Sequence, residues 1–465
     1  MRVLVVGYGM AGSRVAAELR ARDADVKVTA FGAEPHRPYN RILLSSLLAG
    51  KVAEDDLTIA GPGHDADVRL GVSVVGIDPG RRVVVTTEDT HEYDALVLAT
   101  GARPVVPPLD GLSLGNVHAF RTLDDCRAIA AGAAGAGRAV VLGGGLLGVE
   151  AARGLAGRGL DVTIVHAGPW LMERQLDADG GRVLAAALAD AGVRVVVGAT
   201  ARAWTGDALL LADGTVPGDL LVVACGVRPD TALARAAGLA VGRGILVDDA
   251  MRTSDPAISA IGDCAEHRGT VYGLVAPAWD HATTVAERLT GTAVPYHGSR
   301  VVTRLKASGI DLAAMGAVDP DPDAEVVSFA DPARRTYARL VIRDNRVAGA
   351  VLIGDNPTVG SVVQLFDRDA EVPADRRALL LGRALGGEPP ARAESPGFMP
   401  DQAVVCRCNS VRKAAIVASW RDGARTVGDV VAATRATTGC GGCHDAVCGL
   451  VEWLSTVDPR VEVAA

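Results

Sequence analysis

The sequence predicts an α/β protein with two Rossmann-like domains, followed by an α+β domain and a small helical domain. A strand, a glycine-rich turn and a helix follow one another near the N-terminus, and the same order recurs from residue 138. Five cysteines crowd between residues 406 and 448, after a Pro/Gly-rich stretch. A chain of 465 residues is also too long for a single core, so several domains are expected.

Composition and charge exclude several classes of protein. Apolar residues make up 49% of the chain and charged residues 22%, which is typical of a packed globular protein. The net charge of -8 and the lack of a clustered basic stretch argue against a nucleic-acid partner. No apolar run approaches the roughly 20 residues that span a membrane, and the N-terminus does not resemble a signal peptide. We therefore expect a cytoplasmic protein with no membrane segment.

The first glycine-rich turn has the context of a dinucleotide-binding loop. Residues 2–6 predict a buried strand, Gly7-x-Gly9-x-x-Gly12 follows, and a helical pattern runs to about residue 22. The glycines permit a tight turn, close approach of the backbone to a pyrophosphate, and close packing of helix on strand. Glu34, just past the second predicted strand, is the candidate for holding ribose hydroxyls. A motif of this kind standing alone could instead be only a tight turn.

A second copy of the pattern makes an ordinary tight turn improbable. Residues 138–165 repeat the pattern around Gly143-x-Gly145-x-x-Gly148. The simplest use of two such sites is FAD in one and NADH or NADPH in the other, because flavin and nicotinamide must meet for hydride transfer. His166 occupies the place of the usual ribose-binding acid, with Glu173 several residues on. NADH and NADPH stay unresolved, with a modest lean to NADH.

Two later segments support a flavin site. Ala99-Thr100-Gly101 and Gly262-Asp263 resemble segments of two-dinucleotide flavoproteins, in which the aspartate meets the ribityl chain. Alone, Asp263 would more simply be a turn or helix-capping carboxylate. The predicted domains are a discontinuous FAD-binding domain over 1–110 and 240–295, an NAD(P)-binding domain over 111–239, an interface domain over 296–385, a linker over 386–402 and a cysteine domain over 403–457.

The cysteine domain predicts a metal centre. Cys406-x-Cys408 and Cys440-x-x-Cys443 supply four thiolates, which suit either tetrahedral zinc or a 2Fe-2S cluster. A flavin upstream favours the cluster, because a one-electron centre gives flavin electrons an exit and zinc has no redox role. Cys448 is expected to lie in the core of the following helix.

Three segments carry a family resemblance: residues 34–51 (EPHRPYNRILLSSLLAGK), 166–177 (HAGPWLMERQLD) and 272–282 (YGLVAPAWDHA). They resemble the flavin reductase portion of assimilatory nitrite reductase large subunits and the electron-transfer subunit of assimilatory nitrate reductases. The four-cysteine domain is similar to bacterioferritin-associated ferredoxin, and residues 296–385 resemble the family's interface domain over the flavin.

The resemblance implies that NAD(P)H docks on the second domain and passes hydride to FAD. Single electrons would then leave through the 2Fe-2S cluster to a nitrate or nitrite reductase catalytic subunit. The cysteine pairs of the family's sirohaem domain do not occur here, so we expect no nitrite reduction by this sequence itself. Related ferredoxin reductases pair a lysine near the flavin with a glutamate; here Ser46 replaces the lysine and Glu150 remains, both expected near flavin or nicotinamide.

The sequence thus nominates four sets of site residues. The expected FAD ligands are Gly7, Gly9, Gly12, Glu34, Arg41, Thr100 and Asp263, and the expected nicotinamide-cofactor ligands are Gly143, Gly145, Gly148 and Glu150. Further cofactor contacts are expected from Met10, Ala11, Ser45, Gly101, Arg103, Leu147, His166, Gly226 and Gly262. The expected metal ligands are Cys406, Cys408, Cys440 and Cys443.

Two other functions stay open at this point. One is an NAD(P)H reductase for a ferredoxin, rubredoxin or oxygenase, which would differ only in its electron acceptor. The other is a zinc-containing flavin redox sensor, which iron and sulfide analysis would separate from either enzyme. A homodimer also remains open.

Overall fold

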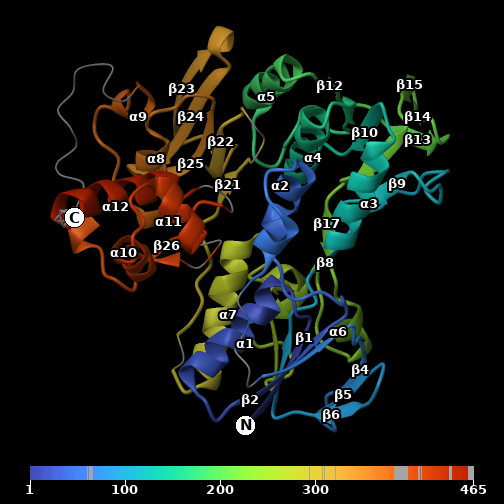
Figure 1. The fold of residues 1–465 in the computed structure, drawn as a ribbon, viewed down its shortest axis with the longest axis vertical. Helices are drawn as coiled ribbons and strands as arrows, with labels where there is room; N and C mark the ends of the chain where they lie inside the picture. Colours follow the sequence, from blue (N-terminus) through green and yellow to red (C-terminus); the bar gives the residue numbers. More distant parts are fainter. Residues whose placement is uncertain are drawn as a thin grey trace, which may run out of the picture.

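The chain folds into four units, which Figure 1 shows as one structure with a narrow lower part and a broad upper part. The first unit lies at the bottom, the second at the upper right, the third at the top left and the C-terminal unit at the left. This computed structural model describes residues 1–59, 61, 66–292, 294–305, 307, 309–319, 321–381, 396–406, 409, 411–438 and 442–458.

The first unit is built on a parallel five-stranded sheet. Its strand order is β19-β7-β1-β2-β3, so a strand from residue 258 onward completes a sheet begun at residue 2. The central run of valines and leucines is buried on both faces, as expected for a parallel strand covered on each side. The sheet strands are β1 (Arg2–Val6), β2 (Lys27–Gly32), β3 (Asp67–Leu70), β7 (Ala95–Leu98) and β19 (Ile258–Ala260).

Helices α1 (Met10–Arg22) and α7 (Val275–Leu289) pack against each other beside this sheet (Figure 1). Smaller elements complete the unit: α2 (Leu44–Leu48), α6 (Ala232–Ala236), β4 (Val74–Asp78), β5 (Val83–Thr86), β6 (Thr90–Glu92), β18 (Ile245–Val247), β20 (Ala265–His267) and the 3-10 turns η1 (Arg41–Leu43), η2 (Glu54–Leu57) and η3 (Gly262–Cys264).

The second unit repeats the architecture. Its parallel sheet has the order β12-β11-β10-β16-β9. Its elements are β9 (Val117–Ala119), α3 (Leu123–Ala134), β10 (Arg138–Leu142), α4 (Leu146–Gly157), β11 (Asp161–Val165), α5 (Ala178–Asp190), β12 (Val193–Val196), β16 (Leu220–Val223) and the antiparallel β13 (Ala201–Trp204), β14 (Ala208–Leu211) and β15 (Gly214–Pro217). A two-stranded crossover of β8 (Ala102–Pro104) and β17 (Val227–Pro229) joins the two units.

The third unit is an antiparallel sheet with a helix against it. The sheet order is β21-β22-β25-β24-β23. Asp344 and Asn345 have φ values of 48° and 60° and form the turn of the β24–β25 hairpin, as a two-residue primed turn requires. The elements are β21 (Val302–Arg304), β22 (Leu312–Gly316), β23 (Glu325–Asp331), η4 (Pro332–Arg334), β24 (Thr336–Arg343), β25 (Arg346–Ile353), α8 (Val359–Arg368) and α9 (Ala378–Leu381).

The C-terminal unit is small and mainly helical. Its elements are η6 (Pro396–Phe398), β26 (Val404–Cys406), β27 (Val411–Arg412), α10 (Lys413–Arg421), α11 (Val427–Thr434) and α12 (His444–Val457). The fold class predicted from the sequence, two Rossmann-like units with an α+β unit and a small helical unit, is confirmed.

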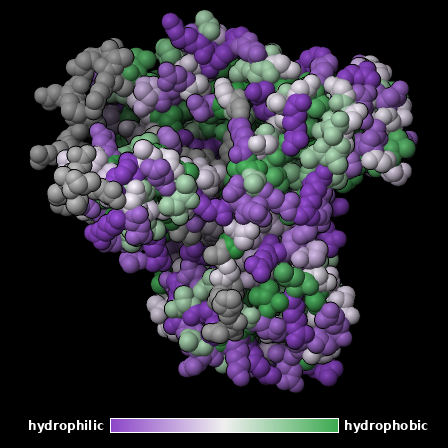
Figure 2. Space-filling view, viewed as in Figure 1, coloured by the Kyte–Doolittle hydropathy of each residue, from purple (hydrophilic) through white to green (hydrophobic). Residues whose placement is uncertain are grey.

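One apolar core joins three of the units. It runs from Leu48 on α2, through Leu155 on α4, to Ile353 on β25. Among the described residues, no helix has the length and apolarity needed to cross a membrane. On the face drawn in Figure 2, hydrophilic residues predominate and hydrophobic ones form separate patches.

Candidate functional site

The first glycine loop is built for close backbone approach. A Cβ on Gly7, where φ is +97°, would lie 2.2 Å from the carbonyl oxygen of Ala99. A Cβ on Gly12 would lie 1.9 Å from the carbonyl oxygen of Gly7, so helix and turn touch directly. Gly9 precedes α1, and a Cβ on it would lie 4.0 Å from Nη2 of Arg41. Space is therefore left at the N-terminus of α1, where an anion is favoured.

The second glycine loop repeats this geometry. A Cβ on Gly143 would lie 2.3 Å from the carbonyl oxygen of Ala224, and one on Gly148 would lie 1.9 Å from that of Gly143. Gly145, at the start of α4, has open space around its Cβ position. The agreement of two independent loops identifies both as dinucleotide-binding turns rather than ordinary tight turns.

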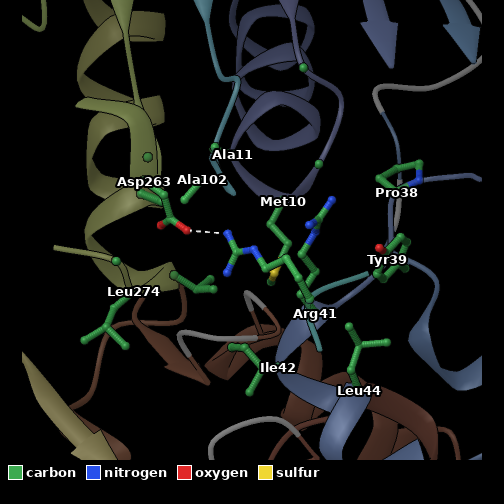
Figure 3. Close-up of a pocket in the computed structure, with 18 of the residues that line it drawn as sticks. Met10, Ala11, Pro38, Tyr39, Arg41, Ile42, Leu44, Ala102, Asp263 and Leu274 are labelled. Carbon is green, nitrogen blue, oxygen red and sulfur yellow. Dashed lines mark hydrogen bonds and ion pairs between the residues drawn. The ribbon is translucent and has the colours of Figure 1, made fainter. Parts of the chain in front are cut away.

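A pocket extends from the first loop across the junction of the units (Figure 3). It receives residues from the first unit, from α4 of the second and from β21 of the third. The residues nominated from the sequence that line it are Gly7, Gly9, Met10, Ala11, Glu34, Arg41, Thr100, Gly101, Leu147, Glu150, Gly262 and Asp263.

Glu34 lies at one end of the pocket with both carboxylate oxygens engaged. Tyr39 donates its hydroxyl to Glu34 Oε2 at 2.7 Å, and the Arg41 guanidinium binds Oε1. Arg41 also stacks over the Tyr39 ring at 5.3 Å from its centroid. Burial raises the pKa of Tyr39 above its usual value, so the hydroxyl stays a donor. These contacts fix in the pocket the acid that the sequence nominated for ribose binding.

Asp263 forms an ion pair with Arg121, a residue that was not predicted from the sequence. Arg121, just before α3, donates through Nη2 to Asp263 Oδ2 at 2.7 Å, the dashed line in Figure 3. Asp263 belongs to the first unit and Arg121 to the segment leading into α3 of the second. Arg121 also lines the pocket. No local signal marks it, because its partner is 142 residues away in sequence.

Ser46, expected near flavin or nicotinamide, lies outside the described lining of the pocket. Its neighbour Ser45 donates its hydroxyl to Glu150 Oε2 at 2.6 Å, and both residues are buried. Adjacent residues on a helix point about 100° apart, so only one of the two serines on α2 can face α4. Of the two nominated serines, Ser45 is therefore the one that contacts Glu150.

His166 lies at the carboxyl end of β11, beside the second loop. The backbone N–H of Gly144 donates to His166 Nδ1 at 3.1 Å. Nε2 of the ring then carries the proton and donates to Glu173 Oε2 at 2.8 Å. The histidine thus brings a carboxylate to the edge of the loop from seven residues away.

Two other nominated residues lie at the crossover between units. Arg103 donates to Asp230 at 2.7 Å and is 69% exposed, outside the described lining of the pocket. Gly226, with φ of +93°, follows β16. Thr100 donates to the carbonyl oxygen of Asp230 at 2.6 Å while lining the pocket. These contacts brace the joint between the two sheets.

The C-terminal unit gathers two of the four predicted metal ligands. Cys406, at the end of β26, and Cys443, before α12, are buried in one apolar core. The N-terminus of α12 favours negative charge, which suits thiolates. Cys408 and Cys440 lie outside the described residues. Cys448 is half-buried on α12, with its sulfur 3.5 Å from His444 Nε2, and is not in the core as the sequence suggested.

The paired glycine loops and their shared junction define a two-dinucleotide-binding flavoprotein. The family profile of pyridine nucleotide-disulphide oxidoreductases matches residues 1–282, and the chain belongs to this family. Profiles of the rubredoxin NAD+ reductase C-terminal domain and of the BFD-like [2Fe-2S] binding domain match residues 302–365 and 404–453.

Curated relatives extend the similarity to nearly the whole chain. A nitrite reductase [NAD(P)H] of Bacillus subtilis is 36% identical over 96% of this chain and 57% of its own length. An assimilatory nitrate reductase electron transfer subunit of the same organism is 34% identical over 98% of this chain and 60% of its own. The chain thus spans less than two thirds of either relative.

Solved structures agree on the fold. The covalent putidaredoxin reductase–putidaredoxin complex is 26% identical with a TM-score of 0.75, over 82% of this chain and 96% of that one. A ferredoxin reductase from Rhodopseudomonas palustris is 30% identical with a TM-score of 0.72, over 80% and 95%. FAD, NAD(P)H and a 2Fe-2S cluster are the groups that these domains imply, and the open cradles at Gly9 and Gly145 and the buried thiols fit them.

Proposed function

We propose that this chain oxidises NAD(P)H and delivers the electrons to a nitrate reductase catalytic subunit, or to that of a nitrite reductase. One observation carries the proposal: Ile42 lines the pocket and also packs against the core that holds Cys406 and Cys443. The dinucleotide site and the cysteine site therefore share a wall. FAD accepts a hydride and releases its electrons singly, which a neighbouring one-electron centre can collect.

The chain's own residues supply binding and orientation. Glu34 with Arg41, Asp263 with Arg121, and Glu150 on α4 line the pocket and would contact the bound FAD. No general acid or covalent nucleophile is required for hydride transfer. The nicotinamide cofactor would approach from the loop at Gly145.

The first test is the cofactor content of the purified protein, and the second is electron transfer to the acceptor. Protein purified without oxygen should contain one FAD and one 2Fe-2S cluster per chain, measured as flavin, iron and labile sulfide. Stoichiometric zinc without iron would remove the electron exit and favour a sensor. NAD(P)H-driven reduction of nitrate should then depend on mixing the chain with a nitrate reductase catalytic subunit.

A second acceptor is favoured by a specific observation, the match of residues 302–365 to a rubredoxin reductase domain. A rubredoxin-NAD(+) reductase of Alcanivorax borkumensis is also 36% identical over 62% of this chain and 78% of its own length. Rubredoxin reduction faster than transfer to either nitrate or nitrite reductase would select this alternative.

A further inference from the structure

The C-terminal unit meets the first unit beside the pocket, through specific polar contacts. Asn40 is 2% exposed and lies between the pocket residues Tyr39 and Arg41. Its Nδ2 donates to Oδ1 of Asn409 at 2.9 Å, across 369 residues of sequence. An amide pair thus crosses the same contact as Ile42.

The orientation of this amide pair is fixed by its surroundings. Asn40 Oδ1 accepts the backbone N–H of Ile42 at 3.1 Å, so only Nδ2 can face the C-terminal unit. Asn409 must therefore present its oxygen to Asn40. Its own Nδ2 then points the other way, toward the cysteine domain.

Asn409 connects the two segments that carry the cysteines. Its Nδ2 donates to the carbonyl oxygen of Arg435 at 2.5 Å and to Thr438 Oγ1 at 2.9 Å. Asn409 directly follows Cys408 in sequence, and Thr438 stands two residues before Cys440. One side chain thereby links both halves of the predicted ligand set to the first unit.

A second bond crosses the contact nearby. The guanidinium of Arg435 donates through Nη1 to the carbonyl oxygen of Thr58 at 2.8 Å. Arg435 has a left-handed backbone, with φ of 62°, at the end of α11. The contact therefore combines an apolar side chain, an amide pair in which Asn40 is buried, and the half-buried Arg435.

We propose that Asn40 and Asn409 are a positioning pair that holds the cysteine segments against the wall of the FAD pocket and so sets the rate of electron passage within the chain. The proposal rests on the proposed function, since it assumes that electrons take this route. Oxidation of one NAD(P)H gives NAD(P)+, one proton and two electrons. A 2Fe-2S cluster takes one electron at a time, so the contact is crossed twice per NAD(P)H.

The substitution Asn40→Asp tests the pair with almost no change in size. An aspartate keeps the oxygen that accepts the Ile42 N–H, but it sets a second oxygen against Asn409 Oδ1. Asn409 could relieve this only by turning its amide, which would put its oxygen against the carbonyl of Arg435. Losing a hydrogen bond of this kind should shift the equilibrium between the docked and undocked C-terminal unit by about tenfold.

The experiment uses the full chain with both cofactors, mixed anaerobically with NADH in a stopped-flow instrument. In Asn40→Asp, bleaching of the flavin should keep its wild-type rate within about twofold, while electron arrival at the cluster slows by about tenfold. Backbone hydrogen exchange should quicken on both sides of the contact, in peptides covering residues 38–43 and 427–438. Asn345→Asp, the same change in the β24–β25 turn, should alter neither rate.

A second variant weakens the same contact at another residue, so that the test does not depend on the folding of Asn40→Asp alone. Arg435→Gln removes the exposed bond to Thr58 while keeping the carbonyl that Asn409 contacts, and it should slow the cluster phase in the same direction but less.

The outcomes separate the two proposals. An unchanged cluster phase in Asn40→Asp, slowing without faster exchange, or loss of FAD or iron in both variants would overturn the positioning role. A wild-type chain whose cluster is never reduced by NADH or NADPH would instead overturn the proposed function.

Discussion

His166 holds a carboxylate, that of Glu173, at the edge of the second glycine loop. The end of β11 carries a histidine where an acid usually holds the ribose, and the spacing alone predicted only a modest lean to NADH. The ring instead anchors Glu173 through Nε2, with Nδ1 fixed by Gly144. A carboxylate is therefore present at the loop, and it would repel the 2'-phosphate of NADPH.

We predict that Glu173→Gln weakens discrimination against NADPH by about tenfold, because an ionised acceptor contributes more than a neutral amide. The measurement is the ratio of kcat/KM for NADH and NADPH with an artificial electron acceptor. Asp179→Asn, an exposed acid on α5, is the matched control and should leave the ratio unchanged. Equal ratios in wild type and Glu173→Gln would mean that another residue reads the ribose.

The N-terminus of α5 fastens the second unit to the third. Asp177 accepts the backbone N–H of Gly180 at 3.0 Å and the hydroxyl of Tyr337 on β24 at 2.5 Å, and it binds Arg339. Burial by itself would raise the pKa of Asp177, but the hydrogen bonds from Tyr337 and Arg339 keep it below its usual value of 3.8. Asp177 therefore both caps α5 and links the second unit to the third.

Asp177→Asn should cost about 2 kcal/mol of stability, because the amide still caps α5 but leaves Arg339 without its carboxylate. A depressed pKa stabilises the fold above the unfolded value and loses this effect as pH falls through the folded value. The difference in Tm between wild type and variant should thus be full at neutral pH and shrink below about pH 4. Tyr337→Phe, which removes one donor only, should cost less. A difference in Tm that stays constant into acid would contradict this role.

Local sequence patterns predicted the helices and strands but not the contacts between them. The two glycine loops were predicted because turn, strand and helix lie within thirty residues of each other, and their spacing encodes the geometry. The sequence did not show which of Ser45 and Ser46 contacts Glu150, because helix phase depends on what packs against α2. Arg121 and Asn40 were missed because their partners, Asp263 and Asn409, come from distant parts of the chain.

In the whole molecule, contacts between units connect the second glycine loop, the pocket and the cysteine core. The second glycine loop leads into α4, α4 supplies Glu150 to the pocket, and the pocket wall at Ile42 borders the cysteine core. Each step between sites crosses a boundary between units. Under the proposed function, hydride transfer precedes any use of the cysteines.

That order can be tested by removing one predicted ligand. Cys406→Ser should leave NAD(P)H-dependent bleaching of the flavin at its wild-type rate, because the first two units are untouched. Transfer to the nitrate or nitrite reductase subunit should fall by about a hundredfold or more, since the electrons lose their one-electron exit. Stopped-flow absorbance follows the first step, and nitrate or nitrite consumption follows the second.

The matched control is Cys448→Ser, which alters a half-buried thiol of the same unit outside the predicted quartet. It should retain iron and both rates. Because Cys406 is fully buried, the variant must be shown to hold FAD and to keep the first two units folded before its rates are compared. An FAD-replete Cys406→Ser protein that loses both steps equally would place the cysteines upstream of hydride transfer. The route inferred from the shared wall at Ile42 would then be wrong.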